Sequence, residues 1–158
     1  SRAVLARGPT AIEMSEDHKP DNAGELRRIE AAGGFVEEGR VKGILALSRA
    51  LGDQEYKLNR KIPVEAQMIT CVPDLKKVSL TSEDKFLVIA CDGIWDCLSS
   101  QECIDVFHKS VKARKAEHSP AKVVEDMFDQ IICKDVHDPN GDGSGTDNMT
   151  CIIVEFKK

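Results

Sequence analysis

The 158-residue chain is long enough for one domain with a substantial core, and its 27 acidic and 22 basic residues give a net charge of −5. This balance, without a dense basic stripe, disfavours a nucleic-acid binder, and no apolar run approaches the ~20 residues of a transmembrane helix. Six cysteines without a C-x-x-C pair argue against zinc-ribbon and thioredoxin-like sites and favour a reducing intracellular location, cytoplasmic or nuclear.

Short strands and one helix are expected in the first third of the chain. Strand patterns occur at residues 3–7, 11–14, 35–36 and 40–41. Leu26 and Ile29 lie on one face of a helical pattern that begins after Asp21, a suitable N-cap residue, and ends at Gly33. Because the chain starts inside a strand pattern, we expect it to be the C-terminal part of a longer domain.

The region 43–68 has the least regular pattern. Its stretch 45–53 is typical of a strand that turns into a helical turn. Two further strands are expected at 68–72 and 75–80, on either side of a Pro-Asp turn, with lysines on a solvated edge or face.

The most apolar stretch, residues 86–90, predicts a buried central strand that requires cover on both faces. Asp92 follows this strand, and Gly93 permits a sharp turn. A short helix then places Asp92 and Asp96 on one face. Two carboxylates at the end of a rigid strand resemble ligands for a hard divalent cation, whereas an isolated Asp-Gly turn is more often a solvated strand end.

Two helices and a final strand complete the chain. Ser99 and Glu102 form a capping-box pattern at the start of the first helix, and Pro120 occupies the first position of the second. Their apolar stripes indicate core packing. The final strand is expected at 149–156.

The loop before the final strand contains a second acidic group. Residues 138–143 superficially match an EF-hand calcium loop, but Met149 occupies the twelfth position, which requires a bidentate glutamate. A calcium-binding module is therefore the weakest of three functional hypotheses. If the final strand runs antiparallel beside 86–90, Asp92 and Asp147 lie at the same edge of one sheet. A pair of divalent cations there could activate a water for attack on phosphorus.

Three stretches resemble the C-terminal motifs of type 2C protein phosphatases, which are metal-dependent serine/threonine phosphatases. They are Leu-Ala-Leu-Ser-Arg-Ala-Leu-Gly-Asp at 45–53, the stretch 88–96, and Gly-Thr-Asp-Asn-Met-Thr at 145–150. Shorter matches, beginning with Ser1-Arg2, follow in the family's order, so the likeness covers nearly the whole chain. The stretch 56–69 is most similar to gamma-type members.

The resemblance implies an α+β fold, an α/β/β/α sandwich of two antiparallel sheets flanked by helices. Residues 1–158 would supply the C-terminal part of a single catalytic domain, with a flap that includes about residues 14–68. By motif, Asp92 and Asp147 are ligands of a pair of manganese or magnesium ions, and Asp96 helps to hold a further, looser ion. The resemblance also implies a structural role near the metal site for four residues, namely Arg49, Asp53, Gly93 and Asn148.

Other motifs of the family do not occur in this sequence. The Asp-Gly-His-Gly segment, the phosphate-binding arginine and the general-acid histidine belong to the family's N-terminal half, and none of the four histidines here fits that acid's motif. The resemblance therefore implies no catalytic residue in this chain beyond the metal ligands. It makes the N-terminal half of the same domain the expected partner.

The leading hypothesis is metal-dependent dephosphorylation of phosphoserine and phosphothreonine in signalling proteins by a metal-activated water. We expect this chain alone to be inactive, because the N-terminal half is required. The runner-up is a non-catalytic binding or regulatory module that keeps the fold, and the intact Asp92, Asp96 and Asp147 argue against it. Neither a nucleic-acid nor a membrane partner is expected.

Overall fold

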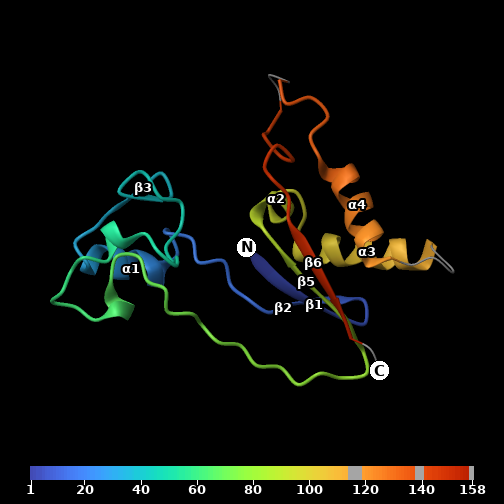
Figure 1. The fold of residues 1–158 in the computed structure, drawn as a ribbon, viewed down its shortest axis with the longest axis horizontal. Coiled ribbons are helices and arrows are strands. Elements are labelled where there is room, and N and C mark those ends of the chain that lie inside the picture. The colour runs from blue at the N-terminus through green and yellow to red at the C-terminus, as the bar shows by residue number, and fades with distance from the viewer. Residues whose placement is uncertain (114–118, 138–140, 157–158) are drawn as a thin grey trace. The chain divides into compact units, whose positions relative to one another are not determined.

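The computed structural model describes residues 1–113, 119–137 and 141–156, which form two compact units (Figure 1). The first, here called the sheet unit, consists of Ser1–Glu16 and Lys76–Lys158. The second, here called the inserted unit, is Asp17–Leu75 and interrupts the sheet unit in sequence. Nowhere in the described ranges does a helix combine the length and apolarity needed to cross a membrane.

The sheet unit is built on four antiparallel strands in the order β2-β1-β5-β6. The strands are β1 (Arg2–Arg7), β2 (Thr10–Glu13), β5 (Asp84–Ala90) and β6 (Cys151–Glu155). β1 and β2 form a hairpin, whereas β1 and β5 are neighbours that the inserted unit separates in sequence. β5 and β6 pair from Phe86 opposite Glu155 to Ala90 opposite Cys151.

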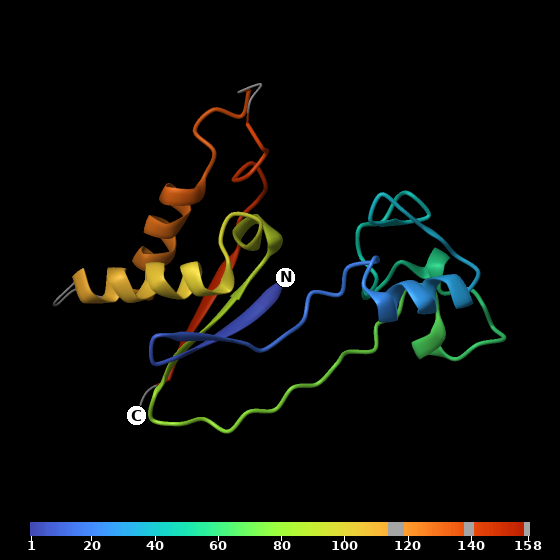
Figure 2. The ribbon, with the colours of Figure 1, turned by 180° about the vertical axis from the view of Figure 1, so that it is seen from behind.

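Alternation of side chains along β5 gives the sheet a covered face and an open face. Phe86, Val88 and Ala90 are buried on the covered face, where α3 (Ser100–Ala113) and α4 (Pro120–Ile131) lie (Figure 2). Strand and helix side chains share one core, whose fully buried members include Val4, Ala6, Val88, Ile94, Cys103, Ile104 and Met127.

The open face carries apolar side chains that no other described element of the sheet unit covers. Ile89 in β5 is 38% exposed, and Ile152 and Val154 in β6 are 56% and 41% exposed. Ile152 lies opposite Ile89, and Val154 lies opposite Leu87, so these side chains form one apolar patch across two strands. The predicted central strand is confirmed, but its expected cover is found on one face only.

Local signals explain where the helices begin. The Glu102 carboxylate accepts the backbone N–H of Ser99 at 2.9 Å and its hydroxyl at 2.7 Å, which confirms the capping box. Pro120 occupies the first turn of α4, as predicted. In the inserted unit, α1 (Ala23–Ala31) begins one residue later than expected, with Asn22 rather than Asp21 as its N-cap.

The inserted unit has a small core of its own beneath α1. Its other elements are β3 (Val36–Glu37), β4 (Arg40–Val41) and the 3-10 helices η1 (Gln54–Tyr56) and η2 (Val64–Ala66). β3 and β4 form the predicted hairpin, and both turn residues, Glu38 and Gly39, have positive φ angles. The buried apolar side chains of this core are Ile29, Val41, Tyr56, Met68 and Ile69.

Three strand predictions in the irregular region are wrong. Residues 45–53, 68–72 and 75–80, all described, contain no strand, and their backbone pairing is limited to single bridges such as Arg49 with Thr70. Leu75 is 93% exposed, so the apolar residues of 75–80 did not indicate a buried face. A strand needs a neighbouring chain for its backbone hydrogen bonds, and an apolar pattern does not supply one. The α+β class itself is confirmed.

Candidate metal centre

The junction between β5 and a one-turn helix positions Asp92 and Asp96. β5 ends at Ala90, and α2 (Asp92–Trp95) begins two residues later. The backbone N–H of Asp96 donates to the carbonyl of Asp92 at 2.8 Å, so the two residues lie one turn apart on the same side of α2. The indole N–H of Trp95 donates to the carbonyl of Ala90 at 2.8 Å and ties the helix to the end of the strand.

Further contacts hold Trp95 in place. The guanidinium carbon of Arg2 lies 5.2 Å from the centroid of the indole ring, which is a cation–π distance. Arg2 donates to the hydroxyl of Ser100 at 3.0 Å, and that hydroxyl donates to the carboxylate of Glu13 at 2.9 Å. β1, β2 and α3 therefore all help to fix α2, and with it the two aspartates.

The loop before β6 lies directly against α2. A Cβ added at Gly93 would lie 2.3 Å from the carbonyl oxygen of Asn148, so a side chain at this position requires the backbone to shift. Gly93 follows Asp92, and Asn148 follows Asp147, so this close approach brings both aspartates to the same edge of the sheet. The arrangement brings two acidic residues from distant parts of the chain to one end of the sheet.

Cys91 links the same two segments. Its backbone N–H donates to the carbonyl of Thr150 at 3.1 Å, and its thiol donates to the carbonyl of Asn148 at 3.3 Å. The backbone N–H of Thr150 in turn donates to the Cys91 sulfur at 3.2 Å. Cys91 and Cys151 are both half-buried, and Cys91 joins β5 to the loop.

Gly145 anchors that loop to the end of α4. Its φ is +75°, and an added Cβ would lie 2.1 Å from the carbonyl oxygen of Ile131. Its own carbonyl accepts the backbone N–H of Cys133 at 2.9 Å.

Sequence reasoning missed the anchoring roles of Trp95, Cys91 and Gly145, and the only available signal was the glycine ahead of the final strand.

The donors at this edge are of the type that suits a hard divalent cation. Asp92, Asp96 and Asp147 are exposed, and none of them forms an ion pair with another described residue. Carboxylate oxygens are preferred ligands of magnesium and manganese. Within the described ranges, however, no group of three or more Asp, Glu, His or Cys side chains is placed to hold a metal ion. The three carboxylates thus fit part of a coordination sphere, and their role as ligands stays a prediction.

The calcium-loop hypothesis concerns residues 138–147, of which 138–140 lie outside the described part of the chain. The carboxylate of Asp142 accepts the backbone N–H of Ser144 at 2.9 Å, and this bond lowers the pKa of Asp142. Such a bond is that of an ordinary Asx turn and accounts for Asp142 without a cation.

A second group of charges lies wholly inside the inserted unit. Glu25 is 5% exposed, and its carboxylate oxygens lie 2.7 Å from Arg49 and 2.6 Å from Arg28. Burial opposes ionisation of Glu25, but hydrogen bonds from Arg49, Ser48 and Arg28 outweigh it and lower the pKa of Glu25 to about 2. The cluster therefore remains ionised at neutral pH.

The same cluster accounts for Arg49, which was predicted to be a structural residue near the site. Arg49 also lies 3.1 Å from one oxygen of Asp74, and Nε2 of His18 lies 2.8 Å from the other. Asp53 has a φ of +49° and precedes η1. Both Arg49 and Asp53 belong to the inserted unit, and a position beside the acidic edge stays a prediction for them.

Comparison with known proteins identifies the family of the chain. The family model described as Protein phosphatase 2C matches residues 1–139. The chain is 46% identical over 158 residues to "Probable protein phosphatase 2C 21" of Arabidopsis thaliana, covering 100% of this chain and 42% of that protein. It is 47% identical over 161 residues to human "Protein phosphatase 1G", covering 99% of this chain and 29% of that protein. The plant and human relatives are thus almost equally similar to this chain.

Solved structures show the same fold. A phosphatase from a pathogenic strain of Toxoplasma gondii matches with a TM-score of 0.82 and 34% identity, over 99% of this chain and 45% of that one. A Caenorhabditis elegans sex determining protein matches with a TM-score of 0.68 and 25% identity, over 97% of this chain and 34% of that one. The chain thus spans less than half the length of these relatives and solved structures.

Proposed function

The chain belongs to the protein phosphatase 2C family, and from this premise we propose that it is the C-terminal part of a catalytic domain that dephosphorylates phosphoserine and phosphothreonine in proteins. The observation that carries the proposal is the close approach of Gly93 to Asn148, which brings Asp92 and Asp147 to one edge of the sheet. Acidic residues fixed in this way are suited to hold cations beside a phosphate group.

Each residue at the edge has a distinct part in this proposal. Asp92 and Asp147 would hold a pair of manganese or magnesium ions, and Asp96, one turn further along α2, would hold a looser ion. Two such metal ions, when bound, activate a water for attack on phosphorus and neutralise charge on the phosphate oxygens. Trp95 keeps α2 against the strand end and so helps to fix the positions of Asp92 and Asp96.

The proposal includes a partner, namely the N-terminal half of the same domain. The open face of the sheet supports it, since an uncovered apolar patch that includes Ile89, Ile152 and Val154 is suited to packing against a second sheet. The incomplete ligand set at the acidic edge supports it as well, because cations of this kind take about six oxygen ligands, some of them waters. The N-terminal half would supply the remaining ligands, the phosphate-binding arginine and the general acid. We also propose an intracellular location, which the six free cysteines support.

The test substitutes the proposed ligands in the complete protein. We expect Asp92→Asn and Asp147→Asn to lower manganese-dependent hydrolysis of a phosphopeptide roughly 100-fold or more, because the nucleophile depends on the cations. Asp96→Asn should be milder, since its ion is held more loosely. Isothermal titration calorimetry with manganese gives a readout that does not depend on turnover, and both ligand variants should lose binding.

Asp129→Asn is the matched control, because Asp129 is also exposed but lies in α4, outside both the α2 junction and the loop before β6. It should leave turnover and manganese binding unchanged. Folded Asp92→Asn and Asp147→Asn variants with normal manganese binding would contradict the ligand assignment. A complete protein that binds manganese but hydrolyses no phosphopeptide would favour the non-catalytic alternative.

A further inference from the structure

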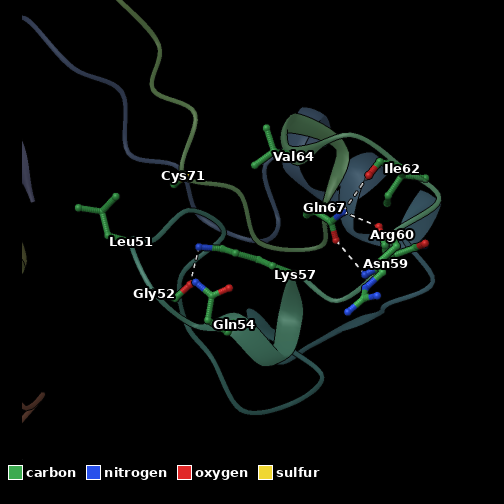
Figure 3. Close-up of a pocket in the computed structure, with 10 residues that line it drawn as sticks. All are labelled: Leu51, Gly52, Gln54, Lys57, Asn59, Arg60, Ile62, Val64, Gln67 and Cys71. Carbon is green, nitrogen blue, oxygen red and sulfur yellow. Dashed lines mark hydrogen bonds between the residues drawn. The ribbon is translucent and has the colours of Figure 1, made fainter.

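The inserted unit contains a pocket of about 460 Å³ that the proposed phosphatase chemistry does not use (Figure 3). Every residue that lines it lies between Leu51 and Cys71, so the pocket belongs to the inserted unit alone. Its volume is within the usual range for ligand sites, which is about 300–1,000 Å³. It is large enough for one or two side chains of a bound segment.

The floor of the pocket is preformed by one buried side chain. Gln67 is 6% exposed, and its amide nitrogen donates to the carbonyls of Asn59 at 2.7 Å and Ile62 at 3.0 Å. Its amide oxygen accepts the backbone N–H of Asn59 at 3.3 Å. Figure 3 shows these bonds fastening the loop that bears Asn59, Arg60 and Ile62 to Gln67. The pocket therefore does not need to be organised by its ligand.

Lys57 fixes the other wall. Its ammonium group donates to the carbonyl of Ala50 at 2.7 Å and to that of Gly52 at 2.5 Å. Gly52 has a φ of +82°, and the turn that it forms presents Leu51 with 89% of its surface exposed. A rigid turn thus holds an apolar side chain in water at the rim of the pocket.

The charges that line the pocket are of one sign. Lys57 and Arg60 are the two charged residues among its lining, and neither forms an ion pair with a described residue. Apolar walls come from Leu51, Ile62 and Val64. This combination disfavours a basic or a purely polar occupant, and it is complementary to an acidic segment that contains an apolar side chain.

We propose that this pocket docks an acidic segment of the phosphoprotein substrate, with an apolar side chain against Leu51 and Val64 and a carboxylate at Arg60. The inference rests on the proposed function, because it names a feature of that function's substrate. Docking of this kind recognises a segment other than the phosphorylated residue and selects among phosphoproteins through affinity.

The first experiment measures binding of a fluorescein-labelled, unphosphorylated peptide with one leucine between glutamates to the full-length protein. We expect Arg60→Glu to weaken binding about fivefold or more, because reversal of a charge at the site opposes the acidic peptide. Lys61→Glu is the matched control, since Lys61 is exposed and adjacent in sequence but does not line the pocket. Equal losses in both variants, or no loss in either, would overturn the proposal.

The apolar contact is tested by Leu51→Ser, which should also weaken binding of this peptide. Leu75→Ser is its control, because Leu75 is 93% exposed in the same unit and lies outside the pocket. Both leucines are almost fully exposed, so neither substitution removes buried apolar contacts of the folded state. An unchanged affinity for Leu51→Ser would overturn the apolar half of the proposal.

Cys71 locates the peptide directly, because it is exposed and lines the pocket. Bound peptide should slow alkylation of Cys71 by iodoacetamide, as measured by mass spectrometry, and leave the rate at Cys133 in the sheet unit unchanged. An unprotected Cys71 at saturating peptide would overturn the proposal. Displacement of the peptide by oligothymidylate of equal charge would also overturn it, since a nucleic acid would then fit as well.

The proposed function is tested separately by manganese-dependent hydrolysis of p-nitrophenyl phosphate by the wild-type protein. That substrate has no acidic segment and does not depend on the pocket. If p-nitrophenyl phosphate is not hydrolysed while the peptide binds and protects Cys71, the proposed function fails, and the pocket is still shown to bind an acidic segment. If it is hydrolysed while the peptide does not bind, only the docking proposal fails.

Discussion

Gly93 is the position at which a single methyl group should disable the acidic edge. An alanine Cβ would lie 2.3 Å from the carbonyl oxygen of Asn148, so either α2 or the loop before β6 must move. We expect Gly93→Ala to lower manganese-dependent turnover of the complete protein roughly 100-fold, because displacement of a reacting group by about 1 Å has an effect of that size. Phosphopeptide hydrolysis and thermal unfolding measure the two consequences, lost activity and lost stability.

Gly24→Ala provides the comparison. Gly24 lies in α1, and an added Cβ would meet nothing within 4 Å. This change should leave turnover unchanged and be neutral or stabilising by up to about 1 kcal/mol, because alanine favours a helix over glycine. If Gly93→Ala behaves like Gly24→Ala, the close approach to Asn148 has no functional role.

At the scale of residues, the sequence pointed to candidate ligands but did not show which contacts hold them in place. Asp92 and Asp147 were singled out because acidic residues at strand ends form a recognisable pattern. The sequence explained Gly93 by a sharp turn, and it did not show that the backbone of Asn148 lies too close for a side chain at this position. The role of Cys91 was not predictable, because its partner Asn148 is 57 positions away and acts through a backbone carbonyl.

At the scale of elements, one buried carboxylate in each unit ties neighbouring segments together. Glu25 joins α1 to Arg49, and Asp84, 2% exposed at the start of β5, joins that strand to Arg7 of β1 at 2.8 Å. Hydrogen bonds from Arg7 and from the backbone N–H of Thr81 lower the pKa of Asp84 to about 2, the same value as for Glu25. Both carboxylates therefore ionise more readily in the folded chain than in the unfolded chain.

This predicts acid sensitivity of a defined sign. The ordinary pKa values are 4.5 for Glu25 and 3.8 for Asp84, and the folded values are about 2. The stabilisation is complete above the ordinary values and is lost as pH falls from them toward 2, because over that range the unfolded chain takes up protons that the folded chain does not. Hydrogen exchange measured residue by residue between pH 5 and pH 2 should show falling protection in both units.

Substitutions separate the two contributions. Glu25→Gln should remove the pH dependence of exchange in α1 and leave that of β5, whereas Asp84→Asn should do the reverse. Each variant is the control for the other. Loss of pH dependence in both units from one substitution would show that acid unfolding is a single global event.

Elements with local signals were predicted well, and elements that depend on a partner were not. The start of α3 follows from Ser99 and Glu102, which are three residues apart, and that of α4 from Pro120. The expected strands at 68–72 and 75–80 failed because nothing in their own residues showed whether a neighbour would pair with them. β5 succeeded because its apolar run was strong enough to indicate a central place in the sheet.

For the whole molecule, the open face of the sheet gives the sharpest expectation. If the N-terminal half covers it, Ile152→Lys buries a charge in the complete protein and should lower the free energy of unfolding by about 2–4 kcal/mol. The same change in residues 1–158 alone should cost little, since Ile152 is 56% exposed there. Urea unfolding of both lengths, with and without the substitution, makes the comparison.

The two lengths should also differ in activity and in surface properties. Residues 1–158 alone should bind a hydrophobic dye through the open face and show no manganese-dependent turnover, because they carry only part of the ligand set. A small effect of Ile152→Lys in the complete protein would mean that this face stays exposed to solvent. Full turnover by residues 1–158 would remove the need for a second half.

The hydrogen-bond contact between His18 and Asp74 has a consequence for the order of folding. The two residues lie next to the two ends of the inserted unit, and their side chains meet at 2.8 Å. β1 and β5 can pair only after the long segment between them is closed into a loop, and closure becomes entropically harder as a loop lengthens. If the inserted unit folds first, the contact between His18 and Asp74 holds its two ends together. The loop that must close before β1 and β5 pair is then much shorter. The contact between His18 and Asp74 should therefore accelerate assembly of the sheet. Its removal should slow refolding even though the native contacts of the sheet are unchanged.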